Sequence, residues 1–273
     1  MTADKRPRKR RAPVSSSASR SPRAGAPPAL WLFDFDNTLA RLEAEVDWAA
    51  ARRELEPAMR ASHAPERLFE KFPRGNLVLY DAWRLELDAS PALNRAARAA
   101  LRRASAIIEK YELAGADLAA PLEGALDLLR VLDRSGATVG IVTSNSSRTV
   151  ERWLKRNRVR GAVDLIVGRD TLLALKPAAD MLARALQAAA TTAVRAVFVG
   201  DSESDLIAAR AAHIRFLGIA ASSVTRDRLA AAGAAEIFAS PAALLNHANL
   251  TARPDRISRI PKRTRLVSAG EIK

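Results

Sequence analysis

The spacing of apolar residues changes twice along the chain. Residues 29–33 form a short, continuous apolar run, which is typical of a buried strand. From residue 43 to residue 111, apolar residues recur three and four positions apart, as they do on helix faces, with breaks at residues 73–75 and 90–91. From residue 121 onward, β-branched runs alternate with helical segments. The pattern therefore predicts one strand, a helical insertion and then an alternating α/β region.

The alternating region predicts the elements of a parallel sheet. Its strands are expected at residues 138–142, 164–167, 196–199, 215–219 and 236–238, and its helices at residues 122–133, 146–158, 177–189 and 203–212. Strands that alternate with helices pair in parallel through right-handed crossovers, and the helices cover both faces of the sheet. The expected fold class is α/β, with a Rossmann-like parallel sheet core and an inserted all-helical domain.

These patterns divide the chain of 273 residues into a core, an insertion and two ends. The core takes residues 29–40 and 119–246, the helical insertion residues 41–118, and the ends residues 1–28 and 247–273. The net charge of +14 is concentrated in the ends, because the first end carries eight basic residues and one acidic residue, and the second carries seven and two. The core and the insertion are together almost neutral.

The first end contains almost no large apolar residues, and we interpret it as a disordered basic tail. Residues 252–273 have a similar composition and predict a second, loosely attached tail. Two interpretations of residues 1–28 and 252–273 stay open: a solvated extension, or a weak, salt-sensitive contact with nucleic acid or another polyanion.

The composition also excludes several classes of protein. The chain has no cysteine, which excludes disulfides, thiol catalysis and cysteine-bound metals. No apolar run approaches the roughly 20 residues that a membrane-spanning helix needs, and no apolar segment follows the charged N-terminal region as in a signal peptide. We therefore expect a cytoplasmic protein without a membrane span.

Two carboxylates follow the first predicted strand. Side chains alternate along a strand, so Asp34 and Asp36 should leave its end on one side while Phe35 points to the other. Asn37 comes next, and asparagine tolerates the left-handed backbone of a sharp turn. Two close carboxylates repel, and a divalent cation is the simplest compensation. The alternative is an ordinary strand end with solvated carboxylates.

Polar residues also follow the later strands. Ser144 and Asn145 stand between a strand and a helix start, where a hydroxyl, an amide and free backbone N–H groups bind an oxyanion or simply cap the helix. Lys176 precedes Pro177 at an expected helix start. Two interpretations stay open: Lys176 pairs with a negative charge, or it is an ordinary surface lysine. Asp201 follows Gly200, which allows a close backbone approach.

Asp205 lies one helical turn after Asp201. Its side chain either lies on the same face as that of Asp201 or caps the helix together with Ser202. Parallel sheets place their ligands beyond the carboxyl ends of the strands. Chance alignment of four such groups at four strand ends is improbable, so we expect them to form one site.

The motifs carrying Asp34-Phe35-Asp36-Asn37-Thr38, Ser144-Asn145, Lys176-Pro177 and Gly200-Asp201 through Asp205 resemble, in this order, the four motifs of the haloacid dehalogenase superfamily. Over residues 30–246 the chain is similar to the phosphoglycolate phosphatase-like subgroup, and the helical insertion resembles its cap. The resemblance implies a Mg²⁺-dependent phosphatase. Asn37 stands where a glycine is commoner, and His213 where a glycine often ends the helix.

The resemblance also implies a role for each residue. Asp34 would be the nucleophile that forms an aspartyl-phosphate, and Asp36 the acid and base. Mg²⁺ would be held by Asp34, the backbone carbonyl of Asp36 and Asp201, with Asp205 orienting Lys176 or a metal-bound water. The expected phosphate-binding residues are Thr38, Ser144, Asn145 and Lys176.

The substrate is expected to be a small phosphomonoester, selected by the cap, where Arg41, Arg74, Arg84 and Arg98 are candidates for contact with an anionic substrate. An acid at position 36 argues against a dehalogenase. Two alternatives stay open: a 5′-phosphatase acting on nucleotides or nucleic acid, and a non-catalytic protein that binds polyanions through its basic tails.

Overall fold

The computed structural model describes residues 28–88, 95–247 and 265–266. The N-terminal basic tail predicted from the sequence, the predicted break at residues 90–91 and most of the C-terminal tail lie outside these residues. Within them, no helix combines the length and apolar character that a membrane span requires.

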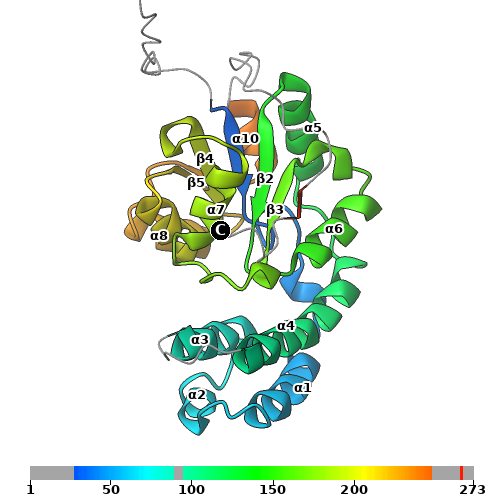
Figure 1. Ribbon diagram of the computed structural model, residues 1–273. Coiled ribbons are helices and arrows are strands. Elements are labelled where there is room, and N and C mark those ends of the chain that lie inside the picture. Colours follow the sequence, from blue (N-terminus) through cyan, green and yellow to red (C-terminus); the bar gives the residue numbers. More distant parts are fainter. Residues whose placement is uncertain (1–27, 89–94, 248–264, 267–273) are drawn as a thin grey trace, which may run out of the picture.

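The centre of the molecule is a seven-stranded sheet of the described residues, in which neighbouring strands pair in parallel (Figure 1). Its strands are β1 (Leu30–Phe33), β2 (Thr138–Val142), β3 (Leu165–Val167), β4 (Ala196–Gly200), β5 (Arg215–Ile219), β6 (Ile237–Phe238) and β7 (Arg265–Leu266). The strand order is β6-β5-β4-β1-β2-β3-β7. The chain therefore reverses its winding direction around β1, and ligands of such sheets bind beyond the strand ends at this point.

Strand β7 lies within the segment that the sequence predicted to be a loose basic tail. It pairs in parallel with β3, with Arg265 opposite Leu165. Backbone groups at the free edge of β3 need partners, and β7 supplies them at these two residues. Arg265 and Leu266 therefore add an edge strand to the sheet.

Helices cover both faces of the sheet, as predicted. They are α5 (Ala125–Ser135), α6 (Ser147–Arg156), α7 (Asp180–Ala188), α8 (Glu203–Ala211), α9 (Ser223–Ala231) and α10 (Pro241–His247). Trp31 and Phe33 share one core cluster with residues of α5, α6 and α10. Leu30 and Leu32 share the other with residues of α7, α8 and α9. The alternation of side chains along β1 thus supplies both cores.

The insertion after β1 consists of helices joined by loops, and its described residues include no strand. It consists of α1 (Trp48–Arg60), α2 (Glu66–Lys71), α3 (Asn76–Asp88) and α4 (Arg95–Ala116). These helices bury Leu55, Met59, Trp83 and Ile108 in a shared apolar cluster. In Figure 1 they form a cap below the carboxyl ends of the strands, and α4 runs from the cap back to the core beside α6.

Several boundaries differ from the prediction. The helix expected from Pro177 begins at Asp180, because the chain first closes a turn in which the Ala178 N–H donates to the Leu175 carbonyl at 2.9 Å. Lys176 therefore lies in a loop and not at a helix start. Helices α9 and α10 were not predicted. The short 3₁₀ helices are η1 (Glu43–Glu45), η2 (Arg160–Ala162), η3 (Arg169–Thr171) and η4 (Ala193–Arg195).

Candidate active site

Asp34 and Asp36 leave the end of β1 as the alternation of the strand predicts. The side chain of Phe35 points to the opposite side and packs edge-on against Trp153, with ring centroids 5.3 Å apart. Asn37 has a φ of 55°, so the chain turns there through the left-handed conformation. The turn brings the backbone N–H groups of the following residues round to the second carboxylate.

Lys176 connects two of the predicted acidic residues. Its buried ammonium forms ion pairs with Asp34 and, at 2.6 Å, with Asp205. Burial lowers the pKa of Lys176, but the charges of Asp205 and Asp34 outweigh burial and raise it above its usual value. Lys176 therefore stays protonated, and it places one positive charge between two carboxylates.

Asp205 takes both of the roles that the sequence left open. It closes a capping box with Ser202, whose N–H and hydroxyl donate to Asp205 at 3.1 and 2.6 Å. Its other carboxylate oxygen faces Lys176. Gly200 makes this arrangement possible, because a Cβ at that position would lie 2.6 Å from the Asp205 side chain.

Asp201 lies beside this cluster at the end of β4. The hydroxyl of Thr38, which is fully buried, donates to Asp201 at 3.2 Å. This hydrogen bond orients the Asp201 carboxylate, and phosphate binding by Thr38 stays a prediction. Oxygen atoms of Asp34, Asp201 and Asp205 all lie within 4.8 Å of one another.

The carboxylate cluster carries more negative charge than Lys176 balances. Burial raises the pKa of Asp34 to about 6, against the opposing charge of Lys176. Burial also raises the pKa of Asp201 to about 8, and the charges of Asp34 and Asp205 add to this effect. Buried carboxylate oxygens in excess of cations are the donor set that a hard divalent ion such as Mg²⁺ prefers. Asp34 and Asp201 are thus suited to hold such an ion.

The second carboxylate has a different environment. One oxygen of Asp36 accepts hydrogen bonds from the backbone N–H groups of Leu42 and Glu43, at 2.9 and 3.0 Å. Burial raises the pKa of Asp36 to about 7, although the bond from Glu43 lowers it. Asp36 can therefore give up and regain a proton near neutral pH, as a general acid and base must.

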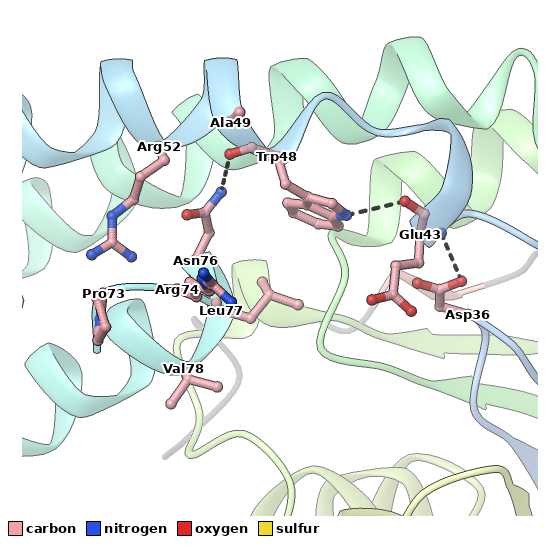
Figure 2. A pocket seen from close by; sticks show the side chains of 11 residues that line it. Asp36, Glu43, Trp48, Ala49, Arg52, Pro73, Arg74, Asn76, Leu77 and Val78 are labelled. Atoms are coloured by element: carbon pink, nitrogen blue, oxygen red, sulfur yellow. Dashed lines mark hydrogen bonds between the residues drawn. The ribbon is translucent and has the colours of Figure 1, made fainter. Parts of the chain in front are cut away.

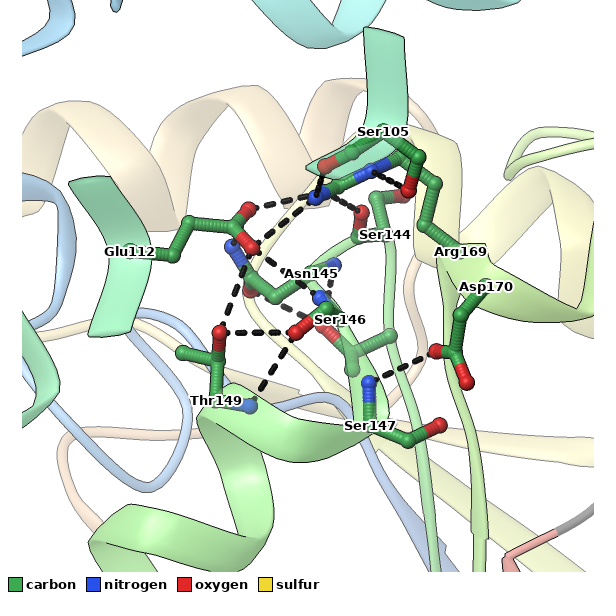
Figure 3. Close-up of polar contacts among 10 residues, drawn as sticks. Ser105, Glu112, Ser144, Asn145, Ser146, Ser147, Thr149, Arg169 and Asp170 are labelled. Atoms are coloured by element: carbon green, nitrogen blue, oxygen red, sulfur yellow. Dashed lines mark hydrogen bonds and ion pairs between the residues drawn. The ribbon is translucent and has the colours of Figure 1, made fainter. Parts of the chain in front are cut away.

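Buried hydrogen bonds hold the loop after β2. The side-chain amide of Asn145 donates to Glu112 at 3.0 Å, and its side-chain carbonyl accepts from the Thr143 hydroxyl at 3.0 Å. At the start of α6, the N–H of Ser146 donates to Glu112 at 3.1 Å and that of Ser147 to Asp170 at 2.7 Å (Figure 3).

Carboxylates of the protein itself therefore occupy the helix N-terminus that the sequence offered to an oxyanion. Ser144 is half-buried, and Arg169 donates to its backbone carbonyl at 2.7 Å. Phosphate binding by Ser144 and Asn145 stays a prediction, and the contacts of Asn145 also position the loop.

Glu112 and Arg169 are two polar residues near the site that the sequence analysis missed. Both side chains are completely buried, and they form an ion pair with a 2.8 Å contact. Burial raises the pKa of Glu112, but the charge of Arg169 and the surrounding hydrogen bonds bring it below its usual value. A glutamate on a helix face and an arginine after a strand gave no signal of this pairing, because arginine is common throughout the chain.

A pocket of about 680 Å³ lies between the core and the cap (Figure 2). Its lining residues are Asp36, Glu43, Trp48, Ala49, Arg52, Pro73, Arg74, Gly75, Asn76, Leu77 and Val78. The amide of Asn76 donates to the carbonyl of Trp48 at 2.9 Å and joins the two cap segments. The pocket thus runs from the proposed acid into the cap, where the part of a substrate beyond the phosphate would lie.

Of the four cap arginines suggested by the sequence, only Arg74 lines this pocket. Arg84 is buried and pairs with Asp81 at 2.7 Å, while Arg41 and Arg98 are exposed. Arg52 lines the pocket and was not predicted. Its guanidinium contacts the Phe72 carbonyl at 2.6 Å, so α1 supplies a cation that the sequence did not single out.

The fold and the site define a doubly wound α/β protein. A cluster of aspartates and a lysine lies where the winding reverses at β1, and a helical cap covers it. The profile of the haloacid dehalogenase-like hydrolases matches residues 82–219. The chain therefore belongs to the haloacid dehalogenase-like hydrolase family, as its sequence predicted.

Known relatives agree with this assignment. The chain is 33% identical over 96 residues to a probable phosphoglycolate phosphatase of Pseudomonas putida, a match that covers 35% of this chain and only 38% of that protein. It is 29% identical over 197 residues to a phosphoglycolate phosphatase of Pseudomonas fluorescens, covering 71% of this chain and 70% of the relative.

A solved structure shares the fold. CbbY from Rhodobacter sphaeroides, solved in complex with phosphate, aligns with a TM-score of 0.55 at 23% identity, covering 80% of this chain and 96% of that one. This likeness confirms the predicted α/β core with a helical cap.

Proposed function

We propose that this protein is a Mg²⁺-dependent phosphatase that hydrolyses a small phosphomonoester through an aspartyl-phosphate on Asp34. The observation that carries the proposal is the buried cluster of Asp34, Lys176, Asp201 and Asp205 beside Asp36 at the carboxyl edge of the sheet. The family assignment and the relatives that are phosphoglycolate phosphatases support the reaction type.

In the first step, a carboxylate oxygen of Asp34 attacks phosphorus and the bond from phosphorus to the ester oxygen breaks. Asp36 gives its proton to the departing oxygen, which leaves as an alcohol. Lys176 stays protonated and offsets charge on the nucleophile and on the phosphoryl oxygens. A divalent cation held by Asp34 and Asp201 would supply further charge neutralisation.

In the second step, Asp36, now ionised, takes a proton from a water molecule as the water attacks phosphorus. The bond between phosphorus and Asp34 breaks, and orthophosphate leaves with Asp34 and Asp36 restored. The hydroxyl of Ser144 is the proposed donor to the phosphoryl oxygens in both steps. The cap would exclude bulk water while the acyl phosphate exists.

A phosphatase screen with Mg²⁺ tests the proposal. The substrates would be 2-phosphoglycolate, a generic aryl phosphate and nucleoside monophosphates, and Asp34→Asn would be assayed beside the wild type. We expect the variant to lose at least about 10³-fold in kcat, because an amide is a poor nucleophile.

Asp227→Asn, an exposed residue of α9, is the matched control and should retain full activity. Turnover by Asp34→Asn at the wild-type rate would refute the assignment of the nucleophile. A wild type that hydrolyses none of these esters with Mg²⁺ would count against phosphatase function.

A further inference from the structure

The loop formed by residues 143–146, here called the phosphate loop, is tied to the cap by a buried ion pair. Arg169 follows β3 in η3 and points its guanidinium between the loop and α4 (Figure 3). It donates to the Ser144 carbonyl at 2.7 Å. The same guanidinium also donates to two atoms of Ser105, the hydroxyl oxygen at 3.2 Å and the backbone carbonyl at 3.3 Å. One side chain therefore contacts both the loop backbone and the middle of α4.

Glu112 completes the connection from the other side. Its two oxygens accept bonds from Arg169 at 2.8 and 3.0 Å. The same oxygens accept from Asn145 at 3.0 Å, from the Ser146 N–H at 3.1 Å and from Thr149 at 3.3 Å. Glu112 and Ser105 lie seven residues apart on α4, so they occupy one face of that helix.

We propose that Glu112 and Arg169 are positioning residues that fix the phosphate loop to the cap helix α4 and thereby set the position of Ser144 for phosphate binding. The inference rests on the proposed phosphatase function, and it adds a connection between cap placement and phosphate affinity. Neither side chain would touch the substrate.

Two features distinguish this pair from an ordinary structural ion pair. The contacts converge on three successive residues of the loop, Ser144, Asn145 and Ser146, and two of them are to backbone atoms. The carboxylate of Glu112 also lies at the N-terminus of α6, where a free anion would otherwise bind. The pair therefore holds the loop, and Glu112 fills the anion-binding position at the N-terminus of α6 with a carboxylate of the protein.

Glu112→Gln tests the proposal with little change in shape. Apart from the Thr149 hydroxyl, every group bonded to the carboxylate is an obligate donor, so either orientation of a glutamine amide faces a donor of Arg169. We expect KM for the ester and the inhibition constant of orthophosphate to rise together by about tenfold, because Ser144 is displaced. The Mg²⁺ concentration for half-maximal activity should stay within twofold.

Glu109→Gln is the matched control, since Glu109 lies on the same helix and pairs with Arg148 of α6 at 2.6 Å without contacting the phosphate loop. It should leave KM and orthophosphate inhibition unchanged. A double variant, Glu112→Gln with Arg169→Met, should be little worse than either single change, because the two residues act as a unit.

Partial unfolding alone would lower the active fraction and leave KM and the orthophosphate constant at their wild-type values. Wild-type values of both constants in Glu112→Gln would overturn the proposal.

If Glu112→Gln does not fold, Ser105→Ala is the second test, because it removes the hydroxyl that accepts from Arg169. KM and the inhibition constant of orthophosphate should then rise about twofold to threefold. Unchanged values of these constants in Ser105→Ala would also overturn the proposal. Because all tests compare variants of an active wild type, their failure is distinct from the absence of phosphatase activity.

Discussion

Each acidic residue of the site has different hydrogen-bond or ion-pair partners. Asp34 faces Lys176, Asp201 accepts from Thr38, and Asp36 accepts from two backbone N–H groups. Burial raises the pKa of all three carboxyl groups, to about 6 for Asp34, about 8 for Asp201 and about 7 for Asp36, while these contacts lower it to different extents. Environments that separate the pKa values of neighbouring carboxyl groups are typical of sites that divide nucleophile, ligand and acid among them.

These pKa values predict a pH-dependent affinity for Mg²⁺. Metal binding requires ionised carboxylates, and Asp201 still holds a proton below about pH 8. Between pH 6 and pH 8 the dissociation constant of Mg²⁺ should therefore fall by up to about tenfold per pH unit. Titration of Mg²⁺ at a series of pH values, followed by calorimetry or thermal unfolding, measures this.

The stability of the metal-free protein should change in the opposite direction. A carboxyl group whose pKa is raised in the folded state stabilises the fold at pH values below its ordinary pKa of 3.8. This contribution is lost as the pH rises toward the folded-state pKa.

Two variants test the prediction for Mg²⁺ binding. Asp201→Asn should abolish most of the pH dependence of the Mg²⁺ dissociation constant, while Glu203→Gln, which changes an exposed acid of α8, should not. Equal Mg²⁺ affinity of the wild type at pH 6 and pH 8 would contradict the prediction.

At the scale of elements, the connection between β4 and α8 places two functional side chains within five residues. Asp201 directly follows the strand, and Ser202 caps the helix in a capping box with Asp205, which also faces Lys176. A tight strand-to-helix turn thus serves both the secondary structure and the site. The space for this turn exists only because residue 200 has no side chain.

Gly200→Ala should therefore disturb the site and the fold together. The new Cβ would lie 2.6 Å from the Asp205 side chain, so the first turn of α8 must move. We expect a loss of about 1–3 kcal/mol in the free energy of unfolding and a lower kcat/KM. Gly161→Ala is the matched control, because nothing lies within 4 Å of a Cβ there. Chemical denaturation that finds the two variants equally stable would contradict the prediction.

At the scale of the whole molecule, the cap and the core meet at two places with different proposed roles. The pocket lined by Asp36, Arg52 and Arg74 would hold the leaving group, and the buried pair of Glu112 and Arg169 ties the cap to the phosphate loop. In this proposal the cap selects the substrate through the pocket, and it also holds the phosphate loop in place.

Arg74→Ala tests the proposed selection by the pocket. For esters with a second negative group, such as 2-phosphoglycolate, KM should rise about twofold to fivefold, as expected for the loss of one exposed charge interaction. For a neutral aryl group KM should not change. Arg98→Ala, an exposed change on α4 outside the pocket lining, is the control. Steady-state kinetics with equal effects of both variants would argue against a role for Arg74.

The sequence by itself determined the parallel α/β core, the helical insertion and the carboxylates at the ends of β1 and β4. These features follow from local rules, since side chains alternate along a strand and parallel strands present their carboxyl ends at one edge of a sheet. The contacts of Lys176 with Asp34 and Asp205 agree with that prediction. The left-handed turn at Asn37 follows from its residue type in the same way.

Only the tertiary structure decided which polar groups pair across long separations. Glu112 meets Asn145 across 33 positions and Arg169 across 57, because α4 packs against the phosphate loop. No periodicity encodes such a meeting, and many arginines could have filled the place of Arg169 or Arg52. The occupied N-terminus of α6, the hydrogen bonds of Asn145 and Thr38, and the arginines of the pocket all result from the way the cap and the loops pack on the sheet.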